Sequence, residues 1–234
     1  LQTAALMRTH FPSRVAIRGG ERAAMMAALD ALAADQPHAD VLVGEARTRG
    51  KVVFVFPGQG SQWAGMGKAL MESAPVFAQA IADCDAALEP LTGWSLTKVL
   101  RGDDDAASLD RVDVVQPALF AMTVGLSALW RSLGVEPSAV VGHSQGEVGA
   151  AVVAGALSLE DAAKVVAARS RLVKRLSGKG GMAVVELAVD AVTERLTDWE
   201  GKLSIAVVNT PTSTVVSGDT DAIDAIAAQF ESEG

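Results

Sequence analysis

The chain has 234 residues, which allows one sizeable core and a smaller additional unit, because a typical domain has about 150 residues. Its 28 acidic and 20 basic residues give a net charge of −8, which argues against a nucleic-acid-binding surface. Half of the residues are hydrophobic and 21% are charged, as in globular proteins. The single cysteine, Cys84, excludes an intrachain disulfide and a cysteine-rich zinc site, and favours the reducing cytoplasm.

The apolar stretches, such as Val148–Leu159, are too short and too rich in glycine and alanine for the ~20 residues that a bilayer requires. We therefore expect no membrane segment. The sequence starts at Leu1, and no basic region precedes an apolar signal segment, so we expect it to be part of something longer.

The first predicted elements are a strand over residues 14–18 and a helix over 21–34, which are too little to fold alone. A polar connection containing Pro37 and Gly44 follows. The composition then changes at the run KVVFVF, residues 51–56, which predicts a buried parallel strand ending in a loop. We expect a new domain to start near residue 51.

Helices and short strands alternate after this run, which predicts an α/β fold. Pro117 is expected in the first turn of its helix. From residue 181 the order becomes strand, helix, strand, strand, helix, which is the ferredoxin-like β-α-β-β-α-β order without its last strand. We expect helices over residues 65–70, 75–88, 117–133, from 145, from 158, 189–199 and 219–230, and strands over 139–142, 182–187, 203–208 and 213–217.

Residues 142–146, Gly-His-Ser-Gln-Gly, match the G-x-S-x-G pattern of a nucleophile elbow. An apolar strand precedes them and a helix follows, as an elbow requires. The glycines leave room for a strained turn that exposes the hydroxyl of Ser144 at a helix N-terminus. The pattern alone is weak, and the alternative is an ordinary helix-capping serine. Its context favours Ser144 as a nucleophile.

A serine nucleophile needs hydrogen-bond donors for the oxyanion, usually the amide after the nucleophile and one from another strand-to-helix loop. Residues 57–62, Pro-Gly-Gln-Gly-Ser-Gln, form such a loop. The alternative, a glycine-rich phosphate-binding loop, is disfavoured: Gln62 and Ala69 break the Walker A pattern, and Trp63 breaks the dinucleotide pattern. The candidate donors are the amides of Gln59 and Gln145.

Arg169 gives the clearest indication of the substrate. It falls within the apolar face predicted for its helix, so its guanidinium should meet an anion. A structural salt bridge or a partly exposed arginine at the edge of the core are the alternatives. The functional interpretation is a fork that binds a substrate carboxylate. That predicted apolar face comprises Ala162, Val165, Val166, Leu172, Val173 and Leu176.

No histidine is a convincing general base for Ser144, although serine-based acyl transfer normally uses one. His143 adjoins the serine, but consecutive side chains at a strand end point in opposite directions, so it more readily supports the elbow. His10 and His38 lie in the N-terminal segment and have the character of surface residues.

Together these features resemble the malonyl/methylmalonyl-CoA acyltransferase family, specifically an acyltransferase domain of a modular type I polyketide synthase. The segments FPGQGSQ (residues 56–62) and GHSQGE (142–147) are its hallmarks. The resemblance implies an α/β-hydrolase-like large subdomain over 51–180, with an inserted ferredoxin-like small subdomain, incomplete, over 181–234. Residues 1–50 resemble part of the α+β linker that joins a ketosynthase to the acyltransferase.

The resemblance also implies roles for individual residues. Ser144 would carry the acyl group, the Gln59 and Gln145 amides would bind the oxyanion, and Arg169 would bind the free carboxylate of the extender unit. The other residues implied near the substrate are Gln116, Asn209 and His143.

The segment RVDVVQ, residues 111–116, and Gln145 resemble the members that select methylmalonyl-CoA rather than malonyl-CoA. The implied partners are an acyl carrier protein, whose phosphopantetheine thiol accepts the acyl group, and the neighbouring ketosynthase. No cofactor or metal is implied for the domain itself.

The family's catalytic histidine and a tyrosine-containing specificity motif are both missing from this sequence. We therefore expect a truncated domain, inactive alone, whose base lies beyond residue 234. The alternatives are an α/β-hydrolase-type esterase or thioesterase, in which water is the acceptor, and a non-catalytic docking fragment.

Overall fold

The structure, a computed structural model, describes residues 7, 9–46 and 50–233. It divides into two compact units, Leu1–Lys51 and Val52–Gly234. The assignment of the first unit to a linker, and of the second to a large and a small subdomain, stays a prediction.

The described residues of the first unit form a two-stranded antiparallel sheet and the helix α2. Its elements are β1 (Ser13–Ile17), α2 (Arg22–Ala33) and β2 (Val41–Glu45). The prediction missed β2, because Gly44 and the preceding proline read as a connection. Pairing with β1 makes this segment a strand, and such long-range pairing can override local propensity.

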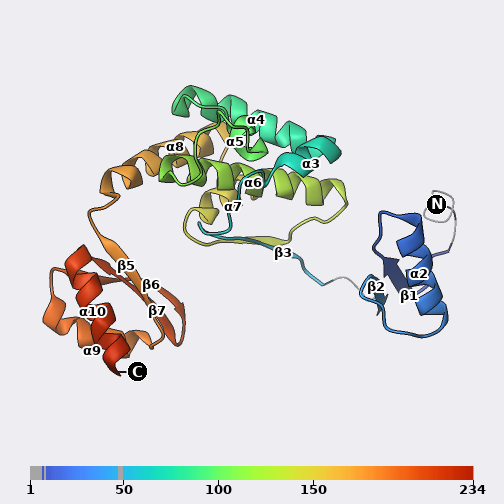
Figure 1. Cartoon of the computed structure of the whole chain (residues 1–234). Coiled ribbons are helices and arrows are strands. Elements are labelled where there is room, and N and C mark those ends of the chain that lie inside the picture. The colour runs from blue at the N-terminus through green and yellow to red at the C-terminus, as the bar shows by residue number, and fades with distance from the viewer. Residues whose placement is uncertain (1–6, 8, 47–49, 234) are drawn as a thin grey trace. The chain divides into compact units, whose positions relative to one another are not determined.

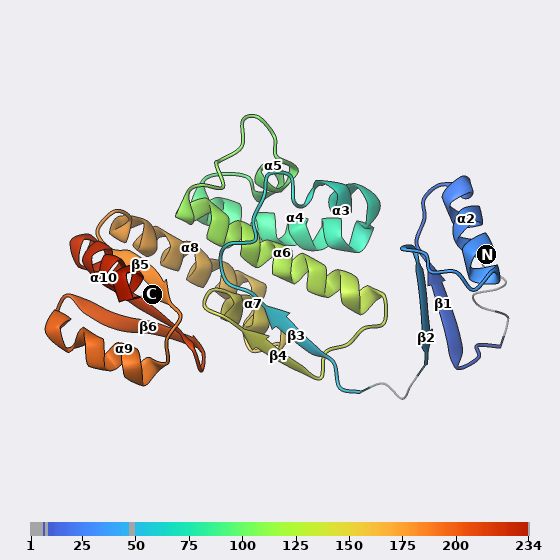
Figure 2. The same cartoon turned by 60° about the horizontal axis from the view of Figure 1, so that its bottom comes forward.

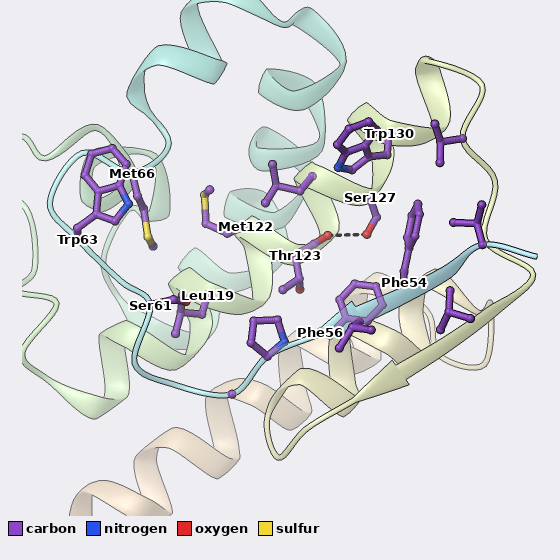
Figure 3. A pocket seen from close by; sticks show the side chains of 17 residues that line it. Phe54, Phe56, Ser61, Trp63, Met66, Leu119, Met122, Thr123, Ser127 and Trp130 are labelled. Carbon is purple, nitrogen blue, oxygen red and sulfur yellow. Dashed lines mark hydrogen bonds between the residues drawn. The ribbon is translucent and has the colours of Figure 1, made fainter. Parts of the chain in front are cut away.

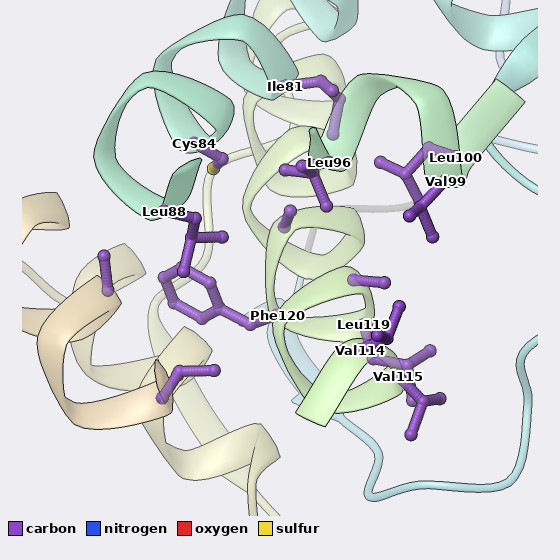
Figure 4. Close-up of a cluster of buried hydrophobic side chains, with 14 of the residues drawn as sticks. Ile81, Cys84, Leu88, Leu96, Val99, Leu100, Val114, Val115, Leu119 and Phe120 are labelled. Atoms are coloured by element: carbon purple, nitrogen blue, oxygen red, sulfur yellow. The ribbon is translucent and has the colours of Figure 1, made fainter. Parts of the chain in front are cut away.

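The second unit opens with alternating helices and strands, which confirms the predicted α/β character (Figure 1). Helices α4, α6 and α8 contact one another, and their facing side chains form the main hydrophobic core, part of which Figure 4 shows. The elements are β3 (Val53–Phe56), α3 (Lys68–Ser73), α4 (Pro75–Thr92), α5 (Leu96–Arg101), α6 (Val112–Ser132), β4 (Ala139–Gly142), α7 (Gly146–Val153) and α8 (Leu159–Leu176).

Two predictions in this part were wrong. Helix α6 begins at Val112, so Pro117 lies inside the helix rather than in its first turn. Helix α5 was not predicted at all, because its N-terminus is stabilised from a distant segment. The carboxylate of Asp85, on α4, accepts hydrogen bonds from the backbone amides of Leu96 and Thr97 at 2.7 and 3.1 Å.

Strands β3 and β4 pair in parallel, with Val53 opposite Ala139 and Phe56 opposite Gly142. Parallel strands carry the loops that follow them at the same end of the sheet. The loop after β3 and the turn after β4 therefore lie together, and α7 starts beside them (Figure 2).

The remaining elements form a separate three-stranded antiparallel sheet with strand order β5-β7-β6. The element order is the predicted one, although the helix predicted over 189–199 is α-helical only to Arg195. A small apolar cluster of its own packs beneath the sheet. The elements are β5 (Gly181–Val185), α9 (Val189–Arg195), a 3₁₀ turn (Leu196–Trp199), β6 (Leu203–Thr210), β7 (Ser213–Gly218) and α10 (Thr220–Glu233).

Within the described residues, α6 alone is long and apolar enough to cross a membrane. However, 61% of its most apolar segment is buried in the protein, as in the core helix of a globular domain. Its neighbours α4 and α8 supply the apolar environment that a bilayer would otherwise provide.

One ion-pair cluster connects the start of α6 to the end of α8. Arg111 and Lys174 both contact the Asp113 carboxylate, at 2.7 and 2.9 Å. The guanidinium of Arg111, and next the ammonium of Lys174, lower the pKa of Asp113 from 3.8 to about 2. A lowered carboxylate pKa stabilises the folded state at every pH above the unfolded value, and this contribution disappears as the pH falls from about 4 to about 2.

We therefore expect Asp113→Asn to lower the free energy of unfolding at pH 7 by about 1–2 kcal/mol. The variant should also lose less stability than the parent between pH 4 and pH 2, because it lacks the titrating group. Urea unfolding at several pH values measures both effects. Equal pH dependence in the two proteins would contradict this account.

Candidate active site

Ser144 lies at a sharp turn between β4 and α7. Its φ is 53°, in the left-handed region that residues with a side chain seldom occupy, and its side chain is exposed. The turn is closed by hydrogen bonds from the Gly146 amide to the His143 carbonyl at 2.9 Å and from the Glu147 amide to the Ser144 carbonyl at 3.1 Å. This is the geometry of a nucleophile elbow, in which local strain presents the hydroxyl at a helix N-terminus.

The two glycines of the pattern are required by close backbone contacts. A Cβ atom at Gly146 would overlap the carbonyl oxygen of Phe56, and one at Gly142 would overlap the backbone of Glu147. Helix α7 therefore starts directly against the end of β3. The packing of these backbones therefore requires glycine at both positions of the G-x-S-x-G pattern, whatever the chemical role of the serine.

The loop after β3 lies beside the elbow. The His143 amide donates to the Phe56 carbonyl at 2.9 Å, and a Cβ atom at Gly58 would lie 3.0 Å from Nδ1 of His143. In the part of the chain that the structure describes, the amides of Gln59 and Gln145 donate to no protein acceptor. Both are therefore free to donate to a ligand.

The Arg169 side chain reaches from α8 to the serine. Its Nη2 donates to Oγ of Ser144 at 3.3 Å, and its Nη1 donates to Oε1 of Gln116 at 2.7 Å. Three helices thus contribute to one cluster: α6 through Gln116, α7 through the turn before it, and α8 through Arg169. Of the predicted site residues, the structure brings these three side chains together.

The predicted apolar face of α8 was only partly correct. Val165, Leu172 and Leu176 are exposed, and Arg169 is half-buried at the edge of the buried face rather than at its centre. Small residues allow α8 to pack closely, which rotates the buried face away from the larger apolar side chains. The buried residues are Ala162, Ala163, Val166, Ala167 and Ser170.

Among the described residues, no carboxylate lies within ion-pair distance of Arg169. The structural salt bridge considered from the sequence is therefore absent from this part of the chain. The partners of the guanidinium are a neutral amide and a neutral hydroxyl, so no described residue pairs its positive charge. A half-buried cation of this kind favours an anionic ligand.

The histidines do not supply a general base in the described structure. Among the described residues, neither His143 nor His38 shares a hydrogen bond with Ser144, and the ring of His143 lies beside Gly58. His10 and His38 belong to the first unit. Gln145 has a buried side chain whose Oε1 lacks a hydrogen-bond donor among the described residues.

Asn209 is the predicted site residue that the structure does not connect with Ser144. It lies on β6, in the separate antiparallel sheet, and is exposed. The polar contacts of the cluster around Ser144 involve none of the residues of that sheet.

A cavity of about 600 Å³ lies close to this cluster in the described part of the chain, and Ser144 is not among its lining residues. It lies between β3 and α6, and its lining is mainly apolar, with Phe54, Phe56 and Trp130 around it (Figure 3). Ser127 lies there too, but its hydroxyl is engaged by the Thr123 carbonyl at 2.7 Å. The loop that follows β3 lines part of this cavity and also lies beside the elbow. Because Ser144 does not line the cavity, we assign the chemistry to the polar cluster of Ser144, Arg169 and Gln116.

Comparisons with known proteins agree with this geometry. The family described as "Acyl transferase domain" matches residues 53–234. Erythronolide synthase EryA2 from Saccharopolyspora erythraea is 53% identical over 232 residues, which are 98% of this chain and 6% of that protein.

Two solved structures are also similar. The acyltransferase domain from module 8 of the salinomycin polyketide synthase is 51% identical, with a TM-score of 0.87, over 99% of this chain and 55% of that one. A malonyl-transacylase in complex with a type II acyl-carrier protein is 29% identical, with a TM-score of 0.68, over 79% of this chain and 60% of that one. This chain thus spans about half of the salinomycin domain. With a serine elbow and an arginine beside it, the chain belongs to the acyl transferase domain family.

Proposed function

We propose that this chain is the N-terminal part of a polyketide synthase acyltransferase domain that moves an extender unit from CoA to an acyl carrier protein. The observation that carries the proposal is the contact between Arg169 and Ser144. A nucleophile and an uncompensated cation 3.3 Å apart suit an acyl donor that has a free carboxylate close to its thioester.

The proposed reaction has two halves. The Oγ of Ser144 attacks the thioester carbonyl, its proton passes to a base, and the C–S bond breaks to release CoA, which takes up a proton. The phosphopantetheine thiol of the carrier protein then attacks the acyl-serine ester and restores the hydroxyl. The backbone amides of Gln59 and Gln145 are proposed to stabilise the negative oxygen in both halves, because neither donates to a protein acceptor among the described residues.

The base is proposed to be a histidine outside residues 1–234. Two observations support this: the described histidines share no hydrogen bond with Ser144, and the chain spans about half of the salinomycin domain. This proposal makes the isolated chain inactive while leaving its nucleophile and carboxylate-binding arginine in place.

Methylmalonyl-CoA is the proposed donor, with malonyl-CoA as the alternative. The support is the resemblance of residues 111–116, and of Gln145 after the serine, to methylmalonyl-selecting members of the family. The proposed partners are the carrier protein and the neighbouring ketosynthase, and the malonyl-transacylase similar to this chain is itself in complex with a carrier protein. Asn209 is proposed to line the same site, and the cytoplasm is the proposed compartment.

An esterase or thioesterase would use the same elbow with water as acceptor. The charge of Arg169 argues against it, because neutral esters give this cation no partner. Rapid hydrolysis of simple neutral esters by the whole domain would instead favour this alternative.

In the whole acyltransferase domain, we expect radiolabelled methylmalonyl-CoA to label the protein covalently at Ser144. Ser144→Ala should abolish the label, because no other side chain is proposed to form the ester. Denaturing gel autoradiography and peptide mapping measure this. An unlabelled wild-type domain, or equal labelling of the variant, would refute the assignment of the nucleophile.

For Arg169→Ala, kcat/KM with methylmalonyl-CoA should fall by about 100-fold or more, since a charge-assisted hydrogen-bonded pair is lost. Activity with acetyl-CoA should change far less, because the acetyl group has no free carboxylate for the guanidinium to bind. Steady-state kinetics with both donors test this. Equal losses with the two donors would disprove the carboxylate-binding role.

The 234-residue chain alone should transfer no acyl group to a carrier protein. Adding the remainder of the domain as a second polypeptide should restore transfer, because it supplies the proposed base. Acylation of the carrier protein, followed by mass spectrometry, measures this. If the chain alone is active, the proposal that its base lies outside residues 1–234 is wrong. If it is inactive both alone and with the remainder of the domain, a non-catalytic docking fragment is favoured.

A further inference from the structure

The Gln116 side chain is an unusual partner for Arg169. It lies within α6 with only 6% of its surface exposed, and its Oε1 accepts the 2.7 Å hydrogen bond from Nη1 of Arg169. This hydrogen bond connects α6 to α8 across 53 residues of sequence. Because Gln116 is buried and its oxygen accepts this hydrogen bond, the oxygen is committed to Arg169.

The same two helices are joined by a second cation, with a different partner. Lys174 of α8 contacts the carboxylate of Asp113 on α6 at 2.9 Å, and Arg111 contacts the same carboxylate. Asp113 lies three residues before Gln116, about one helical turn away. Lys174 is therefore paired with a carboxylate of α6, whereas Arg169 is held by an uncharged acceptor of the same helix.

We propose that Gln116 is a positioning residue that orients Arg169 while leaving its charge available to the carboxylate of the donor. This inference rests on the proposed function. A glutamine oxygen provides the geometry of a carboxylate oxygen without its charge. A glutamate there would form an ion pair with the guanidinium inside the protein, and the donor carboxylate would then compete with it.

The two hydrogen bonds of Arg169 support this division of roles. The bond from Nη1 to Gln116 is short and on the buried side, and it fixes the guanidinium plane. The bond from Nη2 to the exposed Ser144 is longer, at 3.3 Å, and lies where a donor must arrive. A donor carboxylate therefore meets an arginine that is already oriented, which lowers the entropic cost of binding.

The test compares methylmalonyl-CoA with propionyl-CoA, which has the same acyl skeleton without the free carboxylate. In the whole domain, Gln116→Glu should lower kcat/KM for methylmalonyl-CoA by about tenfold or more, mainly through KM, because an internal ion pair competes with the donor. It should change kcat/KM for propionyl-CoA by less than about threefold. Gln116→Met, of similar length and neutral, should lie between Gln116→Glu and wild type.

Lys174→Gln is the matched control, since it removes the ion pair between α8 and Asp113 of α6 and leaves Arg169 untouched. It should leave the ratio of the two kcat/KM values at the wild-type level. Gln116 is merely structural, and the inference is wrong, if Gln116→Glu lowers kcat/KM equally for the two donors. The same conclusion follows if the ratio of the two kcat/KM values is the same in Gln116→Glu and Lys174→Gln. Intact mass spectrometry distinguishes a failure of this inference from a failure of the proposed function. If methylmalonyl-CoA does not acylate the wild-type domain, the proposed function itself is wrong.

Discussion

The close contact between the start of α7 and the end of β3 is the constraint on which the site depends. Gly146 lies against the Phe56 carbonyl, and Gly142 lies against the backbone of Glu147, so the chain must turn sharply between them. Ser144 takes a left-handed conformation to make that turn. Parallel pairing of β3 and β4 places the loop with Gln59 at the same edge, and the core of α4, α6 and α8 holds Arg169 within reach of the serine.

The distribution of charge on α6 and α8 is the basis for the proposed preference for an anionic donor. Asp113 forms ion pairs with Arg111 and Lys174 and contributes stability, whereas Arg169 is held by neutral groups among the described residues. Burying a cation without a counter-ion costs stability. Recognition of an anionic ligand would explain why Arg169 has no carboxylate partner among the described residues. The chain belongs to the acyl transferase domain family, in which such a ligand is an acyl donor with a free carboxylate under the proposed function.

Local patterns predicted much of this arrangement, because the elbow is set by residues adjacent in sequence: 142–146 indicate a strand, a turn and a helix without further information. Arg169 was singled out from its helical position, although the small residues of α8 turn its buried face away from the expected one. Strand β2 and helix α5 escaped prediction because distant partners stabilise them, a paired strand in one case and Asp85 in the other. The contact of Arg169 with Gln116 spans 53 residues and gives no sequence signal, so it required the structure.

The central claim is that Ser144 and Arg169 together select a carboxylated acyl donor. The most direct measurement is a competition in which the whole domain is mixed with equal concentrations of methylmalonyl-CoA and propionyl-CoA, without a carrier protein. Intact mass spectrometry then gives the acyl group on the serine. The account predicts that the methylmalonyl adduct dominates. An equal or larger propionyl adduct would contradict it.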